Sequence, residues 1–290
     1  MGEIKQVITI CGLNFRKWIS NIRIQIIFLL NFLMIYNYLE GIRSFTSLAK
    51  VSVTLWSLPF FMTTFNSLIP IMLGFIFLYC NAPFLDEQQP YLIIRVGRMV
   101  FIVAQILYIF VSSLVYTVFI FLMTVFCSLP RLAFSLEWGK IFKTLALTNA
   151  GSQFNVTLNI PDSLMSQNSP MEAIVKQILL LWLVGCFLGF LIFVLNIRFS
   201  RIVGISCASL FVFLDMFADF FRISHGYFGN KIYFFSPISW VNLTIFKSDP
   251  AETLPTFTYA CFILIFLTII LVAVIIILFR KKTIEVLPQI

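Results

Sequence analysis

The feature that most constrains this sequence is a long run without a single charged side chain. It follows Arg98 and ends before Arg131, and its 32 residues are mostly Val, Ile, Leu, Phe and Tyr. As an α-helix rising ~1.5 Å per residue, the run is longer than the ~30 Å hydrocarbon core of a bilayer. A soluble chain of this size is about a quarter charged, whereas this one is 11% charged and 60% hydrophobic. We therefore expect an all-α, polytopic membrane protein.

Further apolar runs on both sides predict six transmembrane helices in a single domain, residues 1–290. The predicted spans are residues 24–39, 55–80, 99–128, 178–196, 202–221 and 259–279. The fourth contains Gly185-x-x-x-Gly189, a spacing that permits close helix approach. Residues 1–22 place apolar side chains and Trp18 on one face, which predicts an interfacial helix; a polar N-terminal tail is the alternative.

The distribution of basic residues predicts the orientation of the chain. Six spans put both ends on one side, and Lys and Arg at span ends and in short connections favour the cytoplasm. Arg198, Arg201 and Arg280 are of this kind, so we expect cytoplasmic N- and C-termini and an outer loop over residues 129–171. The net charge of +8 is explained by anionic membrane lipid and needs no nucleic-acid partner. The expected location is the cell membrane of a bacterium.

Residues 81–98, between the second and third predicted spans, are unusually rich in charge. Asp86 and Glu87 suit the start of a short helix, where exposed N–H groups favour acidic side chains. Further along, Leu92, Ile93 and Val96 form an apolar edge at helical spacing. The segment is either a solvated loop that anchors two helix ends or a docking element for a soluble protein.

Polar side chains inside the first two spans must find partners within a helix bundle. Pro70 removes a backbone donor and frees the carbonyl of Asn66. A bent, polar turn there would either line a pathway or join neighbouring helices. The residues concerned are Asn31, Asn37, Thr63, Asn66, Ser67 and Pro70.

The fifth span carries three charges near its far end, Asp215, Asp219 and Arg222. Their spacing of four and three residues puts them near one helical face, where an ion-pair ladder would form. A charge this deep in a span is functional by default, but its distance from the start of the helix also suits a structural role close to the outer interface.

The sequence lacks the residues of most catalytic sites. His225 is the only histidine, which excludes His-ligated metal clusters, and the six cysteines show no C-x-x-C spacing. Gly139-Lys140 lacks the remainder of a P-loop. We therefore expect no enzyme activity, no metal site and no cofactor in this chain.

This layout resembles the membrane subunits of ATP-binding cassette (ABC) exporters, specifically the type-two permease family. The resemblance covers essentially the whole chain: the N-terminal helix, the six spans, the charged segment 83–98 and a short element at 236–240. It implies that the segment between spans two and three contacts a cytoplasmic ABC ATPase subunit, which binds ATP and Mg. The coupling residues so implied are Asp86, Glu87, Gln88, Arg95 and Arg98.

The resemblance also implies a pathway between two permease copies, identical or homologous, lined by spans one, two and five. The polar residues of spans one and two named above would line it, and the substrate class stays open between peptide, lipid, drug and ion. One alternative is a secondary transporter that uses Asp215 and Asp219 for ion coupling. Another is a partner or sensor that docks cytoplasmic proteins without transporting anything.

Overall fold

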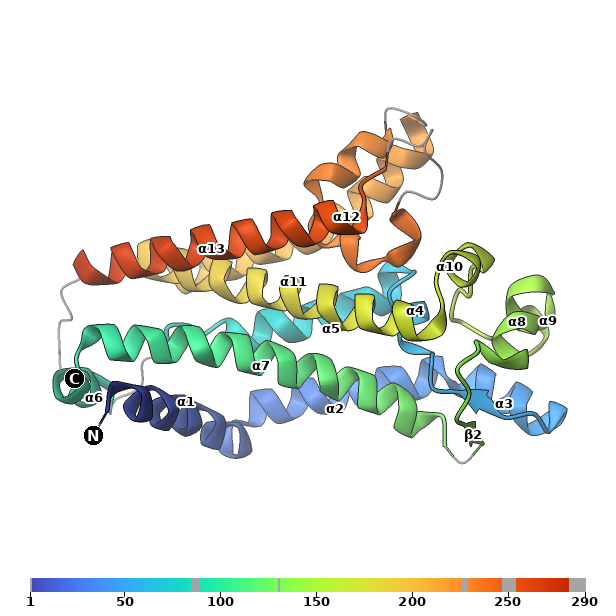
Figure 1. Cartoon of the computed structure of the whole chain (residues 1–290), viewed down its shortest axis with the longest axis horizontal. Coiled ribbons are helices and arrows are strands. Elements are labelled where there is room, and N and C mark those ends of the chain that lie inside the picture. Colours follow the sequence, from blue (N-terminus) through green and yellow to red (C-terminus); the bar gives the residue numbers. More distant parts are fainter. Residues whose placement is uncertain (1, 85–88, 130, 226–228, 247–253, 282–290) are drawn as a thin grey trace.

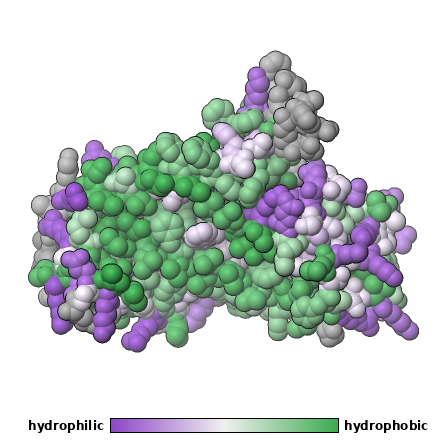
Figure 2. Space-filling view, viewed as in Figure 1, coloured by the Kyte–Doolittle hydropathy of each residue, from purple (hydrophilic) through white to green (hydrophobic). Residues whose placement is uncertain are grey.

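The computed structural model describes residues 2–84, 89–129, 131–225, 229–246 and 254–281, which form an elongated helical bundle (Figure 1). Within these ranges, five helices are long and apolar enough to cross a membrane. On the face shown in Figure 2, apolar side chains cover the middle of the molecule, and hydrophilic side chains gather at its two ends. The chain is therefore a helical, membrane-embedded protein. The five candidate spans are Ile22–Ala49, Arg98–Cys127, Pro170–Arg198, Arg201–Ser224 and Phe257–Arg280.

The chain begins with α1 (Glu3–Ser20), which turns at Asn21 into α2 (Ile22–Tyr38). The Asn21 side chain accepts a hydrogen bond of 3.1 Å from the backbone N–H of Arg23 and so caps α2. A turn at Leu39 then leads into α3 (Glu40–Ala49). The first span is thus longer than the predicted residues 24–39.

The second predicted span, residues 55–80, is not one continuous helix. After strand β1 (Val53–Thr54) come α4 (Leu58–Phe61) and α5 (Phe65–Tyr79), separated by residues 62–64. At ~1.5 Å per residue the 15-residue α5 covers ~22 Å, less than the ~30 Å of hydrocarbon. Pro70 lies inside α5, so the interruption precedes it.

Hydroxyl groups stabilise this interruption. Thr63 Oγ1 donates to the carbonyl of Phe60 at 2.9 Å, and Ser67 Oγ donates to the carbonyl of Phe61. Because side chains satisfy the last carbonyls of α4, the helix can end there without burying unpaired acceptors.

A short helix, α6 (Gln89–Val96), precedes α7 (Arg98–Cys127), which agrees with the predicted third span. The long connection after α7 is folded. Strand β2 pairs in parallel with β1, and three short helices follow it. These elements are β2 (Leu132–Ala133), α8 (Gly139–Leu147), α9 (Ala150–Gln153) and α10 (Asp162–Gln167).

Helix α11 (Pro170–Arg198) is the most buried of the candidate spans, with 67% of its most apolar stretch inside the molecule. It packs against α5, α7, α12 and α13. A Cβ atom at Gly185 would lie 2.3 Å from the ring of Phe75, and one at Gly189 would lie 2.7 Å from Ile109. Glycine at both positions therefore permits the close helix approach that the sequence predicts.

The remaining elements are α12 (Arg201–His225), η1 (Gly229–Phe235), η2 (Ser239–Val241), η3 (Leu243–Ile245) and α13 (Phe257–Lys281). Figure 1 shows α1, α6, the junction of α11 with α12 and the end of α13 together at one end of the bundle. The helices α8 to α10 and the 3₁₀ segments lie toward the opposite end.

Candidate coupling site

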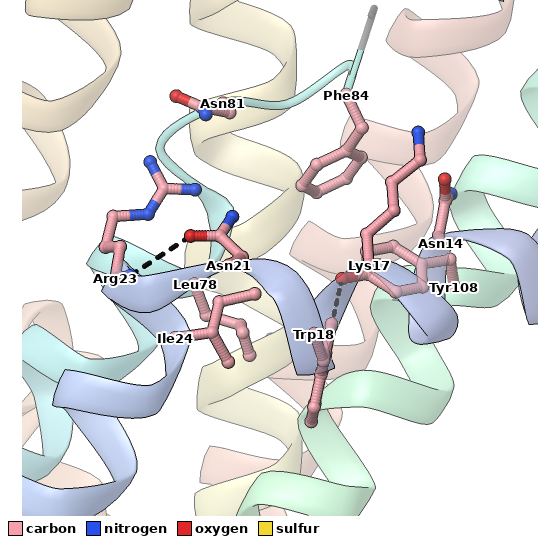
Figure 3. Close-up of a pocket in the computed structure, with 10 residues that line it drawn as sticks. All are labelled: Asn14, Lys17, Trp18, Asn21, Arg23, Ile24, Leu78, Asn81, Phe84 and Tyr108. Carbon is pink, nitrogen blue, oxygen red and sulfur yellow. Dashed lines mark hydrogen bonds between the residues drawn. The ribbon is translucent and has the colours of Figure 1, made fainter.

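The residues that follow α5 meet α1, α2, α7 and α11 at the end of the bundle that holds α6 (Figures 1 and 3). A small cavity of about 60 Å³ lies at this junction, large enough for a few water molecules. Its lining is polar on the side of Asn21, Arg23 and Asn81 and aromatic on the side of Trp18 and Tyr108. We define the candidate coupling site as this junction together with α6.

Two side-chain hydrogen bonds fasten α1 to α7. Asn14 Nδ2 donates to Gln105 Oε1 at 2.8 Å, and Trp18 Nε1 donates to the hydroxyl of Tyr108 at 2.7 Å. The Phe15 ring adds an edge contact with Tyr108, the ring centroids being 5.2 Å apart. Asn14 and Gln105 are both buried, where a polar pair is costly to separate. Helix α1 is therefore held at a defined position along α7.

The turn after α5 is held by side chains from three other helices. Asn196, near the end of α11, donates to the carbonyls of Cys80 at 3.1 Å and Ala82 at 2.8 Å. The guanidinium of Arg23 donates to Cys80 Sγ at 2.8 Å. The rings of Phe84 and Tyr108 meet edge to face with their centroids 4.9 Å apart, and Figure 3 shows both side chains at the cavity. Residues 80–84 are thus joined to α2, α7 and α11.

Phe84 itself has a left-handed backbone, with φ of 60°. This conformation costs a residue with a bulky side chain roughly 1–2 kcal/mol. The packing of the Phe84 ring against Tyr108 offsets part of this cost. The contact therefore also stabilises the direction in which the chain leaves the turn.

Of the predicted coupling residues, Asp86, Glu87 and Gln88 lie outside the described residues. Arg95 is exposed on α6, and Arg98 is exposed at the first position of α7. The apolar edge predicted for this segment is present, because Ile93 is buried while Leu92 and Val96 are half-buried. Gly97, with φ of 87°, makes the bend between the two helices. Arg95 and Arg98 thus face outward, while the apolar edge of α6 packs inward.

The structure does not bring the predicted pathway residues into one lining. Asn31 is buried beside Gly74 and donates to the carbonyl of Ile27 at 2.9 Å. Ser67 is buried and Thr63 half-buried at the interruption before α5. Asn37 and Asn66 are exposed, and Pro70 is half-buried. These side chains therefore divide between the bundle interior and its surface.

The ion-pair ladder expected on α12 does not form among the described residues. Asp219 accepts a hydrogen bond from the hydroxyl of Tyr233 in η1, and Asp215 is buried close to Ser239 in η2. Arg222 is exposed. Burial raises the pKa of Tyr233, and its bond to Asp219 raises it further, so the hydroxyl keeps its proton and remains the donor. The 3₁₀ segments therefore supply the partners that Arg222 was expected to provide.

Several residues of these networks were not predicted as sites. Gln105, Tyr108 and Asn196 are polar residues inside or next to apolar runs, and Tyr233 lies in a connection. An amide or hydroxyl in a span signals that a partner exists, although it does not say which one.

Comparisons of the chain with protein families, curated proteins and solved structures find no match. The fold and the five apolar helices define a polytopic helical membrane protein.

Proposed function

We propose that this chain is the permease subunit of an ABC exporter of the type-two family. It would cross the membrane six times, with α4 and α5 together forming the second crossing and both termini in the cytoplasm. In support, α1, α6, the α11–α12 junction and the end of α13 gather at one end of the bundle. Arg198, Arg201 and Arg280 belong to this end, which favours the cytoplasmic side.

The observation that carries the proposal is the set of bonds around the turn at residues 80–84. This turn is linked to α2 by Arg23, to α7 by Phe84 and to α11 by Asn196. Helix α1 is linked to the same part of α7. A soluble protein that pushed on the segment 81–98 would thus act on several helices together through contiguous contacts.

The exposed face of α6 has the composition of a protein contact. Ile94 is 77% exposed beside the exposed Arg95, and Arg98 is exposed at the start of α7, just after the bend at Gly97. Apolar and Arg side chains are common at protein interfaces. Together with Asp86, Glu87 and Gln88 they would contact a cytoplasmic ABC ATPase subunit. That subunit would bind ATP and Mg²⁺, since this chain has no P-loop of its own.

The pathway would lie between this chain and a second permease copy, identical or homologous. Helices α2–α3 and α12 have only 28% of their most apolar stretches buried, so they leave apolar faces for a partner or for lipid. The interruption before α5, with Asn66 exposed beside it, would supply polar groups to that pathway.

An ion-coupled carrier would instead use Asp215 and Asp219. Deep carboxylates favour such a role in general. Here Asp219 accepts a hydrogen bond from Tyr233, and the buried Asp215 lies close to Ser239. Both contacts favour a role in anchoring the segment 229–241 to α12.

Copurification tests the proposal. The protein is extracted from its native membranes in mild detergent, and a copurifying ATPase is identified and assayed. The double variant Asp86→Lys/Glu87→Lys should lose that subunit or its coupled activity while still inserting. The matched control is Glu137→Lys, a charge reversal at an exposed residue in the loop after α7. Retention of the ATPase and of ATP-driven transport in the double variant would contradict the assignment.

A labelling experiment tests the orientation separately. A cysteine introduced at Arg95 should react with a membrane-impermeant maleimide in inside-out vesicles and not in intact cells. Lys143→Cys, at an exposed position of α8, should show the reverse. Labelling of the Arg95→Cys variant in intact cells would place α6 on the outer side and exclude docking of a cytoplasmic ATPase there.

A further inference from the structure

A large cavity lies between α11, α12 and α13, beside the segment formed by η1 and η2. Its volume is about 490 Å³. Leu191 of α11 and Phe211 of α12 line one side, Trp240 of η2 lines another, and Leu267 and Leu271 of α13 complete it. The candidate coupling site uses none of these residues.

The lining offers no polar group to a ligand. Only two lining side chains carry a polar atom, Trp240 and Tyr259, and both atoms are engaged elsewhere. Trp240 Nε1 donates to the carbonyl of Tyr233 at 2.6 Å, and the Tyr259 hydroxyl donates to the carbonyl of Phe234 at 3.3 Å. Water needs two or more polar partners in such a site, so it is a poor occupant. The cavity therefore favours a hydrocarbon ligand.

The position and size of the cavity indicate which hydrocarbon. The three helices that line it are candidate membrane spans, and Ile270 on its edge is 42% exposed. A helix of a partner protein, ~10 Å across with a pitch of ~5.4 Å, would fit little more than one turn into this volume. A flexible, linear chain fits a space of this size far better, and the bilayer supplies such chains.

We propose that this cavity is a specific binding site for one acyl chain of a membrane phospholipid. The chain would lie against Leu267 and Leu271 and extend beneath Trp240. The acyl chain would give the side chains that line the cavity van der Waals contacts that they otherwise lack. It would thereby stabilise the η1–η2 segment, which contacts Asp215 and Asp219. The assignment does not depend on the proposed transport function.

Photolabelling tests this site. The protein is placed in nanodiscs of phosphatidylcholine that contain a trace of phosphatidylcholine with a diazirine in its acyl chain. After irradiation, labelled residues are mapped by mass spectrometry. We expect several-fold more label at Leu191, Leu267 and Leu271 than at Ile265 and Ile269, which are exposed on the same helix α13. Equal labelling of both groups would show ordinary surrounding lipid and overturn the proposal.

A pair of variants provides the control. Leu191→Trp/Leu267→Trp narrows the cavity and should remove most of the label at Leu271. Ile265→Trp/Ile269→Trp adds the same bulk at exposed positions and should leave that label unchanged. If the first variant unfolds, Leu267→Phe alone should still reduce the label. Undiminished label at Leu271 in a folded cavity variant would overturn the proposal.

Discussion

Trp18 and Tyr108 are joined by a hydrogen bond of 2.7 Å from the indole Nε1 to the phenol oxygen. The two residues are 90 positions apart and belong to the N-terminal helix and to α7. The same Tyr108 ring also receives Phe15 and Phe84 at its edges. One side chain therefore connects α1, α7 and the turn after α5.

The first prediction concerns this bond. Trp18→Phe and Tyr108→Phe should each lower the free energy of unfolding by about 1–2 kcal/mol, because each leaves its partner without a hydrogen bond. The double variant should be destabilised by less than the sum of the two single effects, and the difference, the coupling energy, should be about 1 kcal/mol. Unfolding in detergent micelles measures all three. Tyr36→Phe, at an exposed ring, should change nothing; strictly additive effects would show that the bond contributes no stability.

The second prediction concerns close packing of α11. Gly185→Ala should lower the free energy of unfolding by about 1–3 kcal/mol, because the added methyl group would lie 2.3 Å from the Phe75 ring. Gly12→Ala is the matched control: no atom lies within 4 Å of its new Cβ. Since alanine favours a helix over glycine by about 1 kcal/mol, this variant should be neutral or more stable. Similar melting temperatures for both would contradict the packing argument.

The third prediction concerns the anchor of the turn after α5. Asn196→Leu keeps most of the volume but leaves the carbonyls of Cys80 and Ala82 without their donor. We expect faster hydrogen exchange at residues 80–84 and a free energy of unfolding lower by about 1–3 kcal/mol. If the turn couples to an ATPase, the copurifying activity should fall as well. Asn37→Leu, on an exposed amide, is the control; unchanged exchange at residues 80–84 in Asn196→Leu would mean that the turn is held by other contacts.

The fourth prediction separates anchoring from ion coupling at Asp219. Asp219→Asn keeps an acceptor for the Tyr233 hydroxyl, so stability and ATPase-coupled activity should be largely retained. Asp219→Leu removes the acceptor and should lower the free energy of unfolding by about 1.5–3 kcal/mol. Thermal unfolding and activity of both variants are measured together. A stable Asp219→Asn variant with no transport would favour the carrier, in which the charge itself is needed.

The sequence predicts the long helices well because their signal is local. The run after Arg98 predicts residues 99–128, and the helix found is Arg98–Cys127. The last two spans are likewise found within a few residues of the predicted 202–221 and 259–279. Uninterrupted apolar residues leave the backbone no alternative to internal hydrogen bonding in a membrane.

The interruption of the second span is harder to predict, because its cause is not local. Pro70 is the obvious helix breaker, yet it lies inside α5, and the interruption at residues 62–64 comes before that helix begins. The carbonyl of Thr63 accepts a hydrogen bond from Asn242, and its hydroxyl donates to the carbonyl of Asn159. Both partners lie far along the sequence, so a pattern read over a short window does not contain them.

The same reasoning applies to the candidate sites. The apolar edge of residues 92–96 follows from spacing alone and is found. The partners of Asp215 and Asp219 cannot be predicted from spacing along one helix, which suggested Arg222. Instead, η1 and η2 return to α12 and place Tyr233 and Ser239 beside these carboxylates. Sequence predicts which side chains need partners, while the tertiary fold decides which partners they receive.

The side-chain amide of Asn196 donates to two carbonyls of one short turn, and Asn196 belongs to α11, which packs against α4, α5, α7, α12, α13 and η2. A force on residues 80–82 must therefore either break the hydrogen bonds of Asn196 or move α11. A movement of α11 would in turn disturb the packing of every helix in contact with it.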